Sequence, residues 1–308
     1  MMRTAYLTHP DCLKHEMEIG HPESPLRIRA IEEALIHEGL MPHLDRHQAK
    51  EATMDQLLRV HDKAYVESVH ASSPKSGLVH LDPDTAMNPH TLKAALHAAG
   101  AAAHAVDLVM GKRADNAFCN IRPPGHHAGK GNAAGFCIFN NVAIAAMQAM
   151  EVHGLQRVAI ADFDVHHGNG TEEIFRDDPR VMLCSTFRHP YYPYAGANSG
   201  SERMINVPLP AGTSGASFRS AVETFWLPAL ERFKPQFMLI SAGFDAHIED
   251  QMGGFALREA DYAWVTQKIK EIAAKHAGGR IVSVLEGGYA LSALARSAVQ
   301  HISVLTHE

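Results

Sequence analysis

Residues 157–170 read RVAIADFDVHHGNG, an apolar run that ends in acidic and histidine side chains. An apolar run of this length, followed by glycine, predicts a buried β-strand over 157–164. Because every second side chain of an extended segment points to the same side, we expect Asp162, Asp164 and His166 to share one face. Buried carboxylates beside an imidazole need a partner, and a divalent cation is the usual one. The stretch therefore predicts a strand that delivers metal ligands.

Similar apolar runs recur along the whole chain, with helix-length amphipathic segments between most of them. The further expected strands cover 3–8, 116–121, 181–187, 236–242 and 280–286. The expected helices cover 26–38, 90–110, 141–153, 217–233 and 257–277. Strands that alternate with helices are typical of a mostly parallel sheet covered on both faces. No linker or repeat divides the chain, so we predict a single α/β domain over residues 1–308.

Composition excludes several classes of function. The net charge is -6 with no cluster of lysine or arginine, which argues against a nucleic-acid partner. No apolar run approaches the ~18 residues of a membrane span. The four cysteines form no CxxC pair, which favours reduced thiols and a cytoplasmic location. We therefore expect a soluble protein with neither a nucleic-acid nor a membrane partner, and its oligomeric state, including a homo-oligomer, stays open.

Polar clusters follow four of the expected strands: NIRPPGHH, DFDVHHGNG, SAGFD and EGGY. Ligands of parallel sheets bind beyond the carboxyl ends of the strands, where loops present side chains. Asp164 and His166 supply two metal ligands, and Asp245 of SAGFD is the best candidate for the third. Two oxygens and one nitrogen leave a coordination position open, as in a catalytic zinc site. This ligand set also suits Fe(II), Co(II) or Mn(II).

The remaining clusters supply groups for hydrolysis. Bound zinc would lower the pKa of a water molecule towards ~7. His126 and His127 of RPPGHH are candidate proton carriers, and the phenol of Tyr289 in EGGY is a candidate partner for an oxyanion. No GxSxG motif is present, which argues against a serine hydrolase of the nucleophile-elbow type. The residues point to metal-assisted hydrolysis of an amide or ester.

The four motifs RPPGHHA, DFDVHHGNG, SAGFDAH and LEGGY, in this order, resemble the zinc-dependent histone deacetylase superfamily, especially its class II and bacterial amidohydrolase-like members. The likeness runs from HPESPLR at 21–27 to EGGY at 286–289. It implies the arginase/deacetylase fold, a single α/β domain with an eight-stranded parallel sheet. It also implies a deacetylase that removes acetyl or short acyl groups from acyl-lysine-like amines with metal-activated water.

The resemblance assigns roles residue by residue. It implies that Asp164, His166 and Asp245 bind zinc, that His127 is the general base and later the general acid, and that His126 assists it electrostatically. It further implies that Tyr289 polarises the substrate carbonyl and that Asp162 supports the histidines from behind. A structural potassium ion would lie at Asp162, Asp164, His166, Ser185 and Thr186. A tunnel for the acyl-lysine chain would be lined by Gly135, Phe136, Tyr192 and Met252, and Arg27 would lie in a cavity through which acetate leaves.

Two departures separate branches of the superfamily. Position 169 is Asn, as in class II members, where class I members have Asp. Because an amide brings no charge, we expect both tandem histidines, His126 and His127, to titrate lower than beside a carboxylate. The acetylpolyamine branch carries a long insertion where only 12 residues separate Val69 from Asp82 here. This argues against the narrowed entrance of the polyamine type.

Some assignments stay open at this stage. Asp82 and Asp84 of HLDPDT could form a turn and a helix cap. The resemblance implies that an acidic residue near here binds the backbone amides of the substrate, and which of the two does so stays open. His167 is expected to point away from the metal and to pack. Acetylpolyamine deacetylation remains the alternative within the same chemistry. A non-catalytic sensor of acyl ligands is the alternative from another class, although it would not need the full set of motifs.

Overall fold

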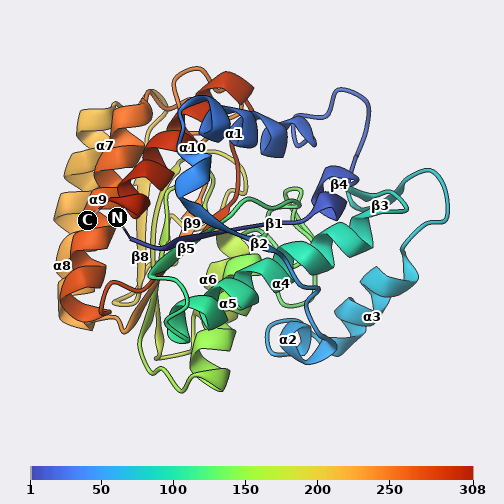
Figure 1. The fold of residues 1–308 in the computed structure, drawn as a ribbon, viewed down its shortest axis with the longest axis horizontal. Helices are drawn as coiled ribbons and strands as arrows, with labels where there is room; N and C mark the ends of the chain where they lie inside the picture. Colours follow the sequence, from blue (N-terminus) through green and yellow to red (C-terminus); the bar gives the residue numbers. More distant parts are fainter. Residues whose placement is uncertain (1, 308) are drawn as a thin grey trace.

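Eight strands form the central sheet of the computed structural model, which describes residues 2–307. They are β1 Thr4–Thr8, β2 Leu44–Gln48, β5 Asn116–Cys119, β6 Val158–Asp162, β7 Val181–Arg188, β8 Met204–Leu209, β9 Phe237–Ala242 and β10 Ile281–Leu285. Their order across the sheet is β2-β1-β5-β10-β9-β6-β7-β8, and every neighbouring pair is parallel (Figure 1). The carboxyl ends of all eight strands therefore meet at one edge.

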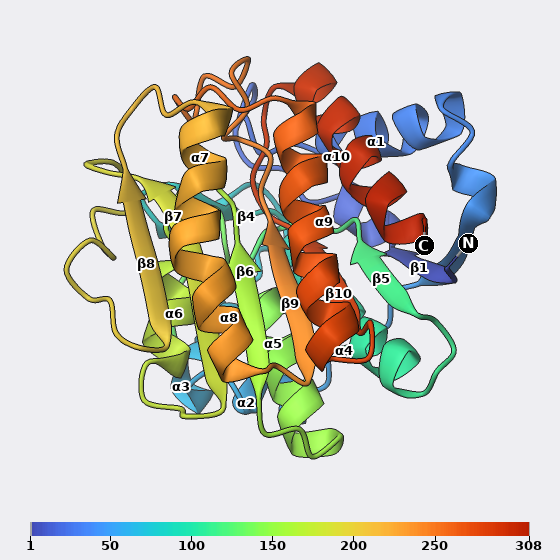
Figure 2. The same ribbon diagram turned by 90° about the vertical axis from the view of Figure 1, so that its left-hand side faces the viewer.

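The strands alternate their apolar side chains between two helical layers. In β6, Val158 and Ile160 belong to one buried cluster, whereas Ala159 and Ala161 belong to the other. The first cluster is covered by α4 (Thr91–Met110) and α5 (Asn141–Met147). The second lies under α1 (Leu26–His37), α7 (Gly215–Ala221), α8 (Leu227–Phe233), α9 (Glu259–His276) and α10 (Leu291–Thr306), several of which stand in front of the sheet in Figure 2. This two-sided burial explains why the central strands are continuous apolar runs.

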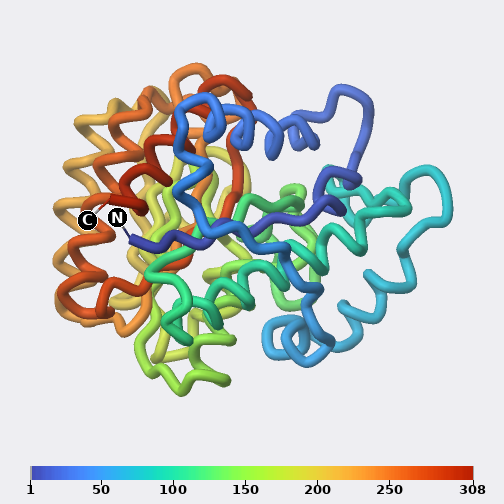
Figure 3. The backbone as a smooth tube through the Cα atoms, viewed as in Figure 1, coloured from blue at the N-terminus to red at the C-terminus, as the bar shows by residue number. Residues whose placement is uncertain are grey.

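The shorter elements lie around this three-layer body. They are the helices α2 Met54–Leu58, α3 Lys63–Ala71 and α6 Asn169–Phe175, and the antiparallel strands β3 Val79–Asp82 and β4 Thr85–Met87. The two ends of the described chain meet, because the Met2 N–H donates to the Thr306 carbonyl at 3.0 Å (Figure 3). None of the helices among the described residues is long and apolar enough to cross a membrane.

The predicted single α/β domain with an eight-stranded parallel sheet is confirmed, and six of its strands were expected from their own sequence. The two edge strands β2 and β8 were not, because strands covered only in part need no apolar run. β2 reads LDRHQ, and only its first residue is fully buried. The expected helices all form, with ends at most two residues from those expected. π-Helical turns at Gln148–Val152 and Val222–Trp226 continue α5 and join α7 to α8.

Candidate active site

Asp164, His166 and Asp245 come together at the carboxyl edge of the sheet, in the loops that follow β6 and β9. The Nδ1 atom of His166 lies 3.0 Å from Asp164 Oδ1 and 3.1 Å from Asp245 Oδ2. All three residues are buried. One imidazole nitrogen and two carboxylates that converge without a thiolate fit a catalytic zinc ion better than a closed structural one.

The backbone that presents these ligands differs from the extended strand we expected. β6 ends at Asp162, so the prediction of a strand through residue 164 was wrong. Asp162 Oδ1 accepts the N–H of Asp164 at 3.1 Å, and Asp164 Oδ1 accepts the N–H of His166 at 2.8 Å. Two consecutive turns of this kind bond each carboxylate to the backbone two residues on, which competes with extension of the strand. The residues converge through these turns and not through strand alternation.

The electrostatics of the trio favour a cation. Burial raises the pKa of Asp245 to about 7, and the charge of Asp164 adds to this effect. Burial opposes a charge on His166, yet its bonds to Asp164 and Asp245 raise the pKa of the imidazole to about 10. A divalent ion would relieve the repulsion between the two carboxylates.

Glycines allow the carboxylates to pack this closely. A Cβ atom at Gly287 would lie 2.1 Å from Asp245 Oδ2, and one at Gly243 would lie 2.1 Å from Asp164 Oδ2. Backbone groups hold the remaining oxygens: the Gly287 N–H donates to Asp164 Oδ2 at 2.8 Å, and the Val165 N–H donates to Asp245 Oδ1 at 2.9 Å. Both carboxylates are therefore fixed in orientation by the backbone around them.

His126 and His127, after β5, have different partners. The Nδ1–H of His126 donates to Asp162 Oδ2 at 2.9 Å, and that of His127 donates to Asn169 Oδ1 at 2.7 Å. Burial alone would lower the pKa of His126, but Asp162 and Asp164 outweigh it and hold that pKa well above its usual range. Burial holds the pKa of His127 well below its usual range, and the neighbouring His126 adds to this. The expectation that both histidines titrate low was therefore wrong for His126, because Asp162 and not Asn169 is its partner.

Tyr289 follows β10 on the turn 286–289, close to the same ligands. Asp250 fixes its backbone, because Asp250 Oδ2 accepts the Tyr289 N–H at 2.6 Å. The guanidinium carbon of Arg27 lies 5.0 Å from the centre of the phenol ring. Burial raises the pKa of Tyr289 well above its usual range, so the phenol keeps its proton. Arg27 is fully buried, and its Nε donates to the Gly288 carbonyl at 2.6 Å.

A cavity of about 230 Å³ joins these groups. It is lined by Asp84, His127, Gly135, Phe136, His166, Tyr191, Tyr192, Met252 and Tyr289. The four residues expected as tunnel walls are all among them. The rings of Phe136 and Tyr289 meet edge to face with centroids 5.9 Å apart, and Tyr192 meets His127 in the same way at 5.1 Å. Aromatic walls and a polar inner end suit an elongated apolar chain that ends in a polar group.

Asp84, rather than Asp82, lines this cavity. Asp84 Oδ1 accepts the Gly135 N–H at 3.2 Å, and the Thr85 hydroxyl accepts the Phe136 N–H at 3.0 Å. Both Gly135 and Phe136 have positive φ angles, of 55° and 69°. The turn between β3 and β4 therefore holds the 135–136 segment, whose backbone conformation is costly for Phe136 and needs such support.

The neighbourhood expected for a monovalent cation lies between β6 and β7, where Asp162 pairs with Ser185. Ser185 and Thr186 are buried. His167 points away from the trio, as expected, but it is more than a packing residue. Its Nδ1 lies 3.2 Å from the Ser185 hydroxyl, and its Nε2 lies 2.5 Å from Glu172 Oε2. Burial would raise the pKa of Glu172, but His167 and other partners lower it to about 2.

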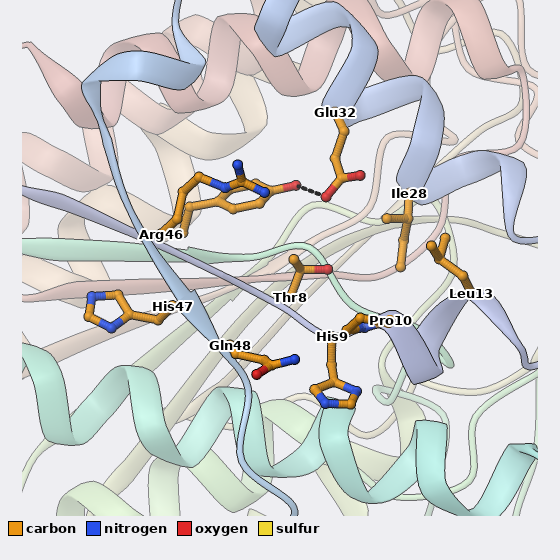
Figure 4. A pocket seen from close by; sticks show the side chains of 10 residues that line it. Thr8, His9, Pro10, Leu13, Ile28, Glu32, Arg46, His47 and Gln48 are labelled. Atoms are coloured by element: carbon orange, nitrogen blue, oxygen red, sulfur yellow. Dashed lines mark hydrogen bonds between the residues drawn. The ribbon is translucent and has the colours of Figure 1, made fainter.

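Two other groups of potential metal ligands occur among residues 2–307, around His97 and around His247, but in both some members are exposed or only half-buried. A larger cavity, of about 460 Å³, lies between α1 and the strands β1 and β2 (Figure 4). It contains Glu32, which accepts a hydrogen bond from the Tyr6 hydroxyl at 3.4 Å, and Arg46. No candidate catalytic residue lines it. Of the three groups found among residues 2–307, the trio is the one whose members are all buried, and it borders a cavity through His166.

Three further residues contact the site or the residues around it, although we had assigned them no role; two of them lie in the quoted motifs. Glu286 is the second letter of LEGGY, and its carboxylate accepts backbone N–H groups of the histidine turn. Tyr191 stacks on His166, with ring centroids 5.5 Å apart. Glu23 of HPESPLR binds Arg27 and Arg122. The sequence could have indicated Glu286, because it is a charged residue in a motif that is otherwise apolar and glycine-rich. Nothing in the sequence indicated Tyr191.

Comparison with known proteins identifies the family of this chain. A model of the histone deacetylase domain matches residues 21–305. A probable deacetylase of Archaeoglobus fulgidus is 38% identical over 298 residues, which cover 94% of this chain and 82% of that protein. A histone deacetylase-like amidohydrolase of Pseudomonas aeruginosa is 40% identical over 279 residues, which cover 88% and 73%.

The solved structure of the HD domain of HDA15 superposes with a TM-score of 0.93 at 36% identity, covering 99% of this chain and 88% of that one. Fold, domain model and relatives agree over almost the whole chain. The chain therefore belongs to the histone deacetylase family, whose members are hydrolases that act on amide bonds.

Proposed function

We propose that this protein is a zinc-dependent amidohydrolase that removes an acetyl or other short acyl group from a lysine-like amine. One observation carries the proposal: the buried trio of Asp164, His166 and Asp245 adjoins the same aromatic cavity that His127 and Tyr289 line. The carbonyl of an amide at the inner end of this cavity would meet an electrophile, a base and a hydrogen-bond donor together.

Asp164, His166 and Asp245 would hold the zinc ion. Bound zinc polarises the amide carbonyl and lowers the pKa of a water molecule. Backbone N–H groups of His166 and Gly287 hold Asp164, and that of Val165 holds Asp245, which fixes the orientation of both carboxylates. The family likeness also suggests a structural potassium ion beside Asp162, Asp164, His166, Ser185 and Thr186.

His127 would move the proton. Its Nδ1–H is committed to Asn169, so Nε2 carries the lone pair that accepts a proton from water. Burial keeps the imidazole neutral, as a base requires. Once the tetrahedral carbon has formed, the protonated His127 returns the proton to the leaving amine nitrogen, and the C–N bond breaks. His126, charged beside Asp162, supplies a fixed positive field and does not exchange its proton.

Tyr289 would stabilise the oxyanion. Its phenol keeps its proton at neutral pH, and the guanidinium group of Arg27 packs against the phenol ring. A donor of this kind is worth about 10²- to 10³-fold in turnover. Replacing Tyr289 with Phe is therefore expected to lower kcat by that factor with little change in KM, and an unchanged kcat would remove Tyr289 from this role.

The cavity walls support an acyl-lysine-like substrate. Phe136, Tyr192 and Met252 would contact the methylene chain, and Asp84 lies where it could accept backbone N–H groups of a peptide. Arg27 remains our candidate for guiding acetate out. The short connection between Val69 and Asp82 argues against a polyamine-specific entrance. All four cysteines are free and buried, which supports a reducing compartment such as the cytoplasm.

The direct test measures acetate release by the purified, zinc-loaded protein from an acetyl-lysine peptide and from acetylputrescine. We expect a higher kcat/KM for the peptide. A higher value for acetylputrescine would favour the polyamine alternative. Tight binding of acylated ligands with no hydrolysis of any amide or ester would favour the alternative function, a non-catalytic sensor of acyl ligands.

A further inference from the structure

Glu286 is a fully buried carboxylate between the two turns that carry the candidate catalytic side chains. It follows β10 directly and precedes Tyr289 by three positions. Its Oε2 atom accepts the N–H of Gly125 at 2.7 Å and the N–H of His126 at 3.1 Å. One side chain from the tyrosine turn thus binds the backbone of the histidine turn 122–127.

The same short turn reaches the metal ligands through its backbone. The Gly287 N–H donates to Asp164 Oδ2 at 2.8 Å, and the Glu286 N–H donates to the Ala242 carbonyl of β9 at 3.0 Å. Arg27 anchors the turn from beneath through the carbonyls of Glu286 and Gly288. These bonds hold the turn 286–289 in place, so a group bonded to the turn is positioned relative to Tyr289 and to Asp164.

We propose that Glu286 is a positioning residue for the reaction: its carboxylate ties the histidine turn to the tyrosine turn and so fixes His126 and His127 relative to Tyr289 and the metal ligands. This inference rests on the function proposed above. Glu286 itself is not among the residues that line the substrate cavity, so it acts through the histidines and not on the substrate.

The way in which Glu286 is buried fits a functional role better than a purely architectural one. Its Oε1 atom has no hydrogen-bond partner within residues 2–307. A buried carboxylate with one unused oxygen is costly unless a nearby charge offsets it. Burial raises the pKa of the Glu286 carboxyl to about 7, and His126 is the main neighbour that opposes this shift. A glutamine would offer the same acceptor atom to Gly125 and His126 without the charge, so the two contributions are experimentally separable.

The expected signature is a loss of kcat with KM preserved. Catalytic groups need placement to within about 0.5 Å, and removing the partner that orients such a group costs roughly 10- to 100-fold in activity. Glu286→Ala removes both the acceptor and the charge. Glu286→Gln keeps the acceptor and should recover a substantial part of the lost kcat. Glu32→Gln is the matched control, because Glu32 is a half-buried glutamate in the remote cavity of Figure 4.

The experiment measures kcat and KM on an acetyl-lysine peptide for the zinc-loaded wild type and for the three variants. Turnover is expressed per active site, counted by titration with a small hydroxamic acid that binds zinc, so that misfolded protein does not lower kcat. Zinc content is measured in parallel. We expect about 10- to 100-fold lower kcat in Glu286→Ala, an intermediate kcat in Glu286→Gln, and unchanged KM and zinc in both.

An unchanged kcat in Glu286→Ala, or a raised KM in place of a lowered kcat, would overturn the positioning role. Equal losses in the Ala and Gln variants would also overturn it, because the acceptor atom would then be irrelevant. If Glu286→Ala yields no titratable sites, Glu286→Asp replaces it: its shorter side chain cannot hold both N–H groups, and an unchanged kcat would equally reject the proposal. A wild type that neither binds zinc nor releases acetate would instead reject the proposed function.

Discussion

Two pairs of adjacent histidines lie on neighbouring turns of this molecule, and their four rings have four different surroundings. In the 126–127 pair, His126 faces a carboxylate and His127 faces an amide. In the 166–167 pair, His166 lies between the carboxylates of Asp164 and Asp245. His167 points away from them and is bonded to Glu172 and Ser185. The residue type is constant, so the partner of each Nδ1 or Nε2 atom sets what each ring does.

The turn 122–127 can therefore hold a charged imidazole, His126, beside a neutral one, His127. Asp162 keeps the proton on His126, and that positive charge helps to keep His127 neutral. In the second pair, the partners distinguish a candidate metal ligand, His166, from His167, whose ring is bonded to Glu172 and Ser185 in the interior. Changing the partner of a ring should therefore change its properties. Four substitutions test the roles assigned to these rings, in order of decreasing expected effect.

Replacing His166 with Ala should have the largest effect. The trio loses its only nitrogen ligand, so zinc binding and activity should fall together, activity by more than about 10⁴-fold. Metal analysis and acetate release measure both. Retention of one zinc ion per chain in this variant would mean that the metal lies elsewhere.

Replacing His127 with Ala should leave zinc in place and lower kcat by about 10²- to 10⁴-fold, the usual contribution of a general acid–base group. Zinc content distinguishes this variant from the His166 variant, because loss of the base should leave zinc bound whereas loss of a ligand should not. Loss of zinc in the His127 variant would contradict the different roles assigned to the two rings.

Replacing Asn169 with Asp should make the environment of His127 resemble that of His126. A carboxylate on the Nδ1–H stabilises the imidazolium and raises the pKa of His127. Because the base must be neutral, the acidic limb of the profile of kcat/KM against pH should move to higher pH, by about one unit. Asn169→Ser, which adds no charge, is the control. A limb that stays in place in the Asp variant would show that His127 is not the base.

Replacing His167 with Ala should affect stability more than chemistry. It leaves Glu172 without its closest partner, at a cost of roughly 1–3 kcal/mol in the free energy of unfolding. Since the folded-state pKa of Glu172 is lowered to about 2 from 4.5, the deficit should be full above pH 4.5 and shrink as pH falls towards 2. Urea unfolding at several pH values measures it. Lost zinc with unchanged stability would reverse the roles of His166 and His167.

The sequence was informative where burial on both faces forced a pattern. The central strands β6, β9 and β10 could be predicted because each is a continuous apolar run, and the candidate site residues because each follows such a run. The edge strand β2 could not, since most of its side chains face solvent.

The sequence could not predict which side chain accepts the hydrogen bond of each histidine ring. Asn169 is 42 positions from His127, and Asp162 is 36 positions from His126. Nothing in the spacing says which acceptor meets which ring. The same holds for Glu286, whose contact with the histidine turn depends on β5 and β10 being neighbours in the sheet.

We propose that one metal ion, held by Asp164, His166 and Asp245, is required for the amidohydrolase activity of this chain. The most direct measurement is a zinc titration of metal-free protein, following acetate release from an acetyl-lysine peptide at each addition. We predict that activity rises in proportion to zinc and reaches its full value at one equivalent per chain, and that the Asp245→Ala variant shows no such rise. Activity that is independent of added metal, or an undiminished titration in that variant, would contradict the account.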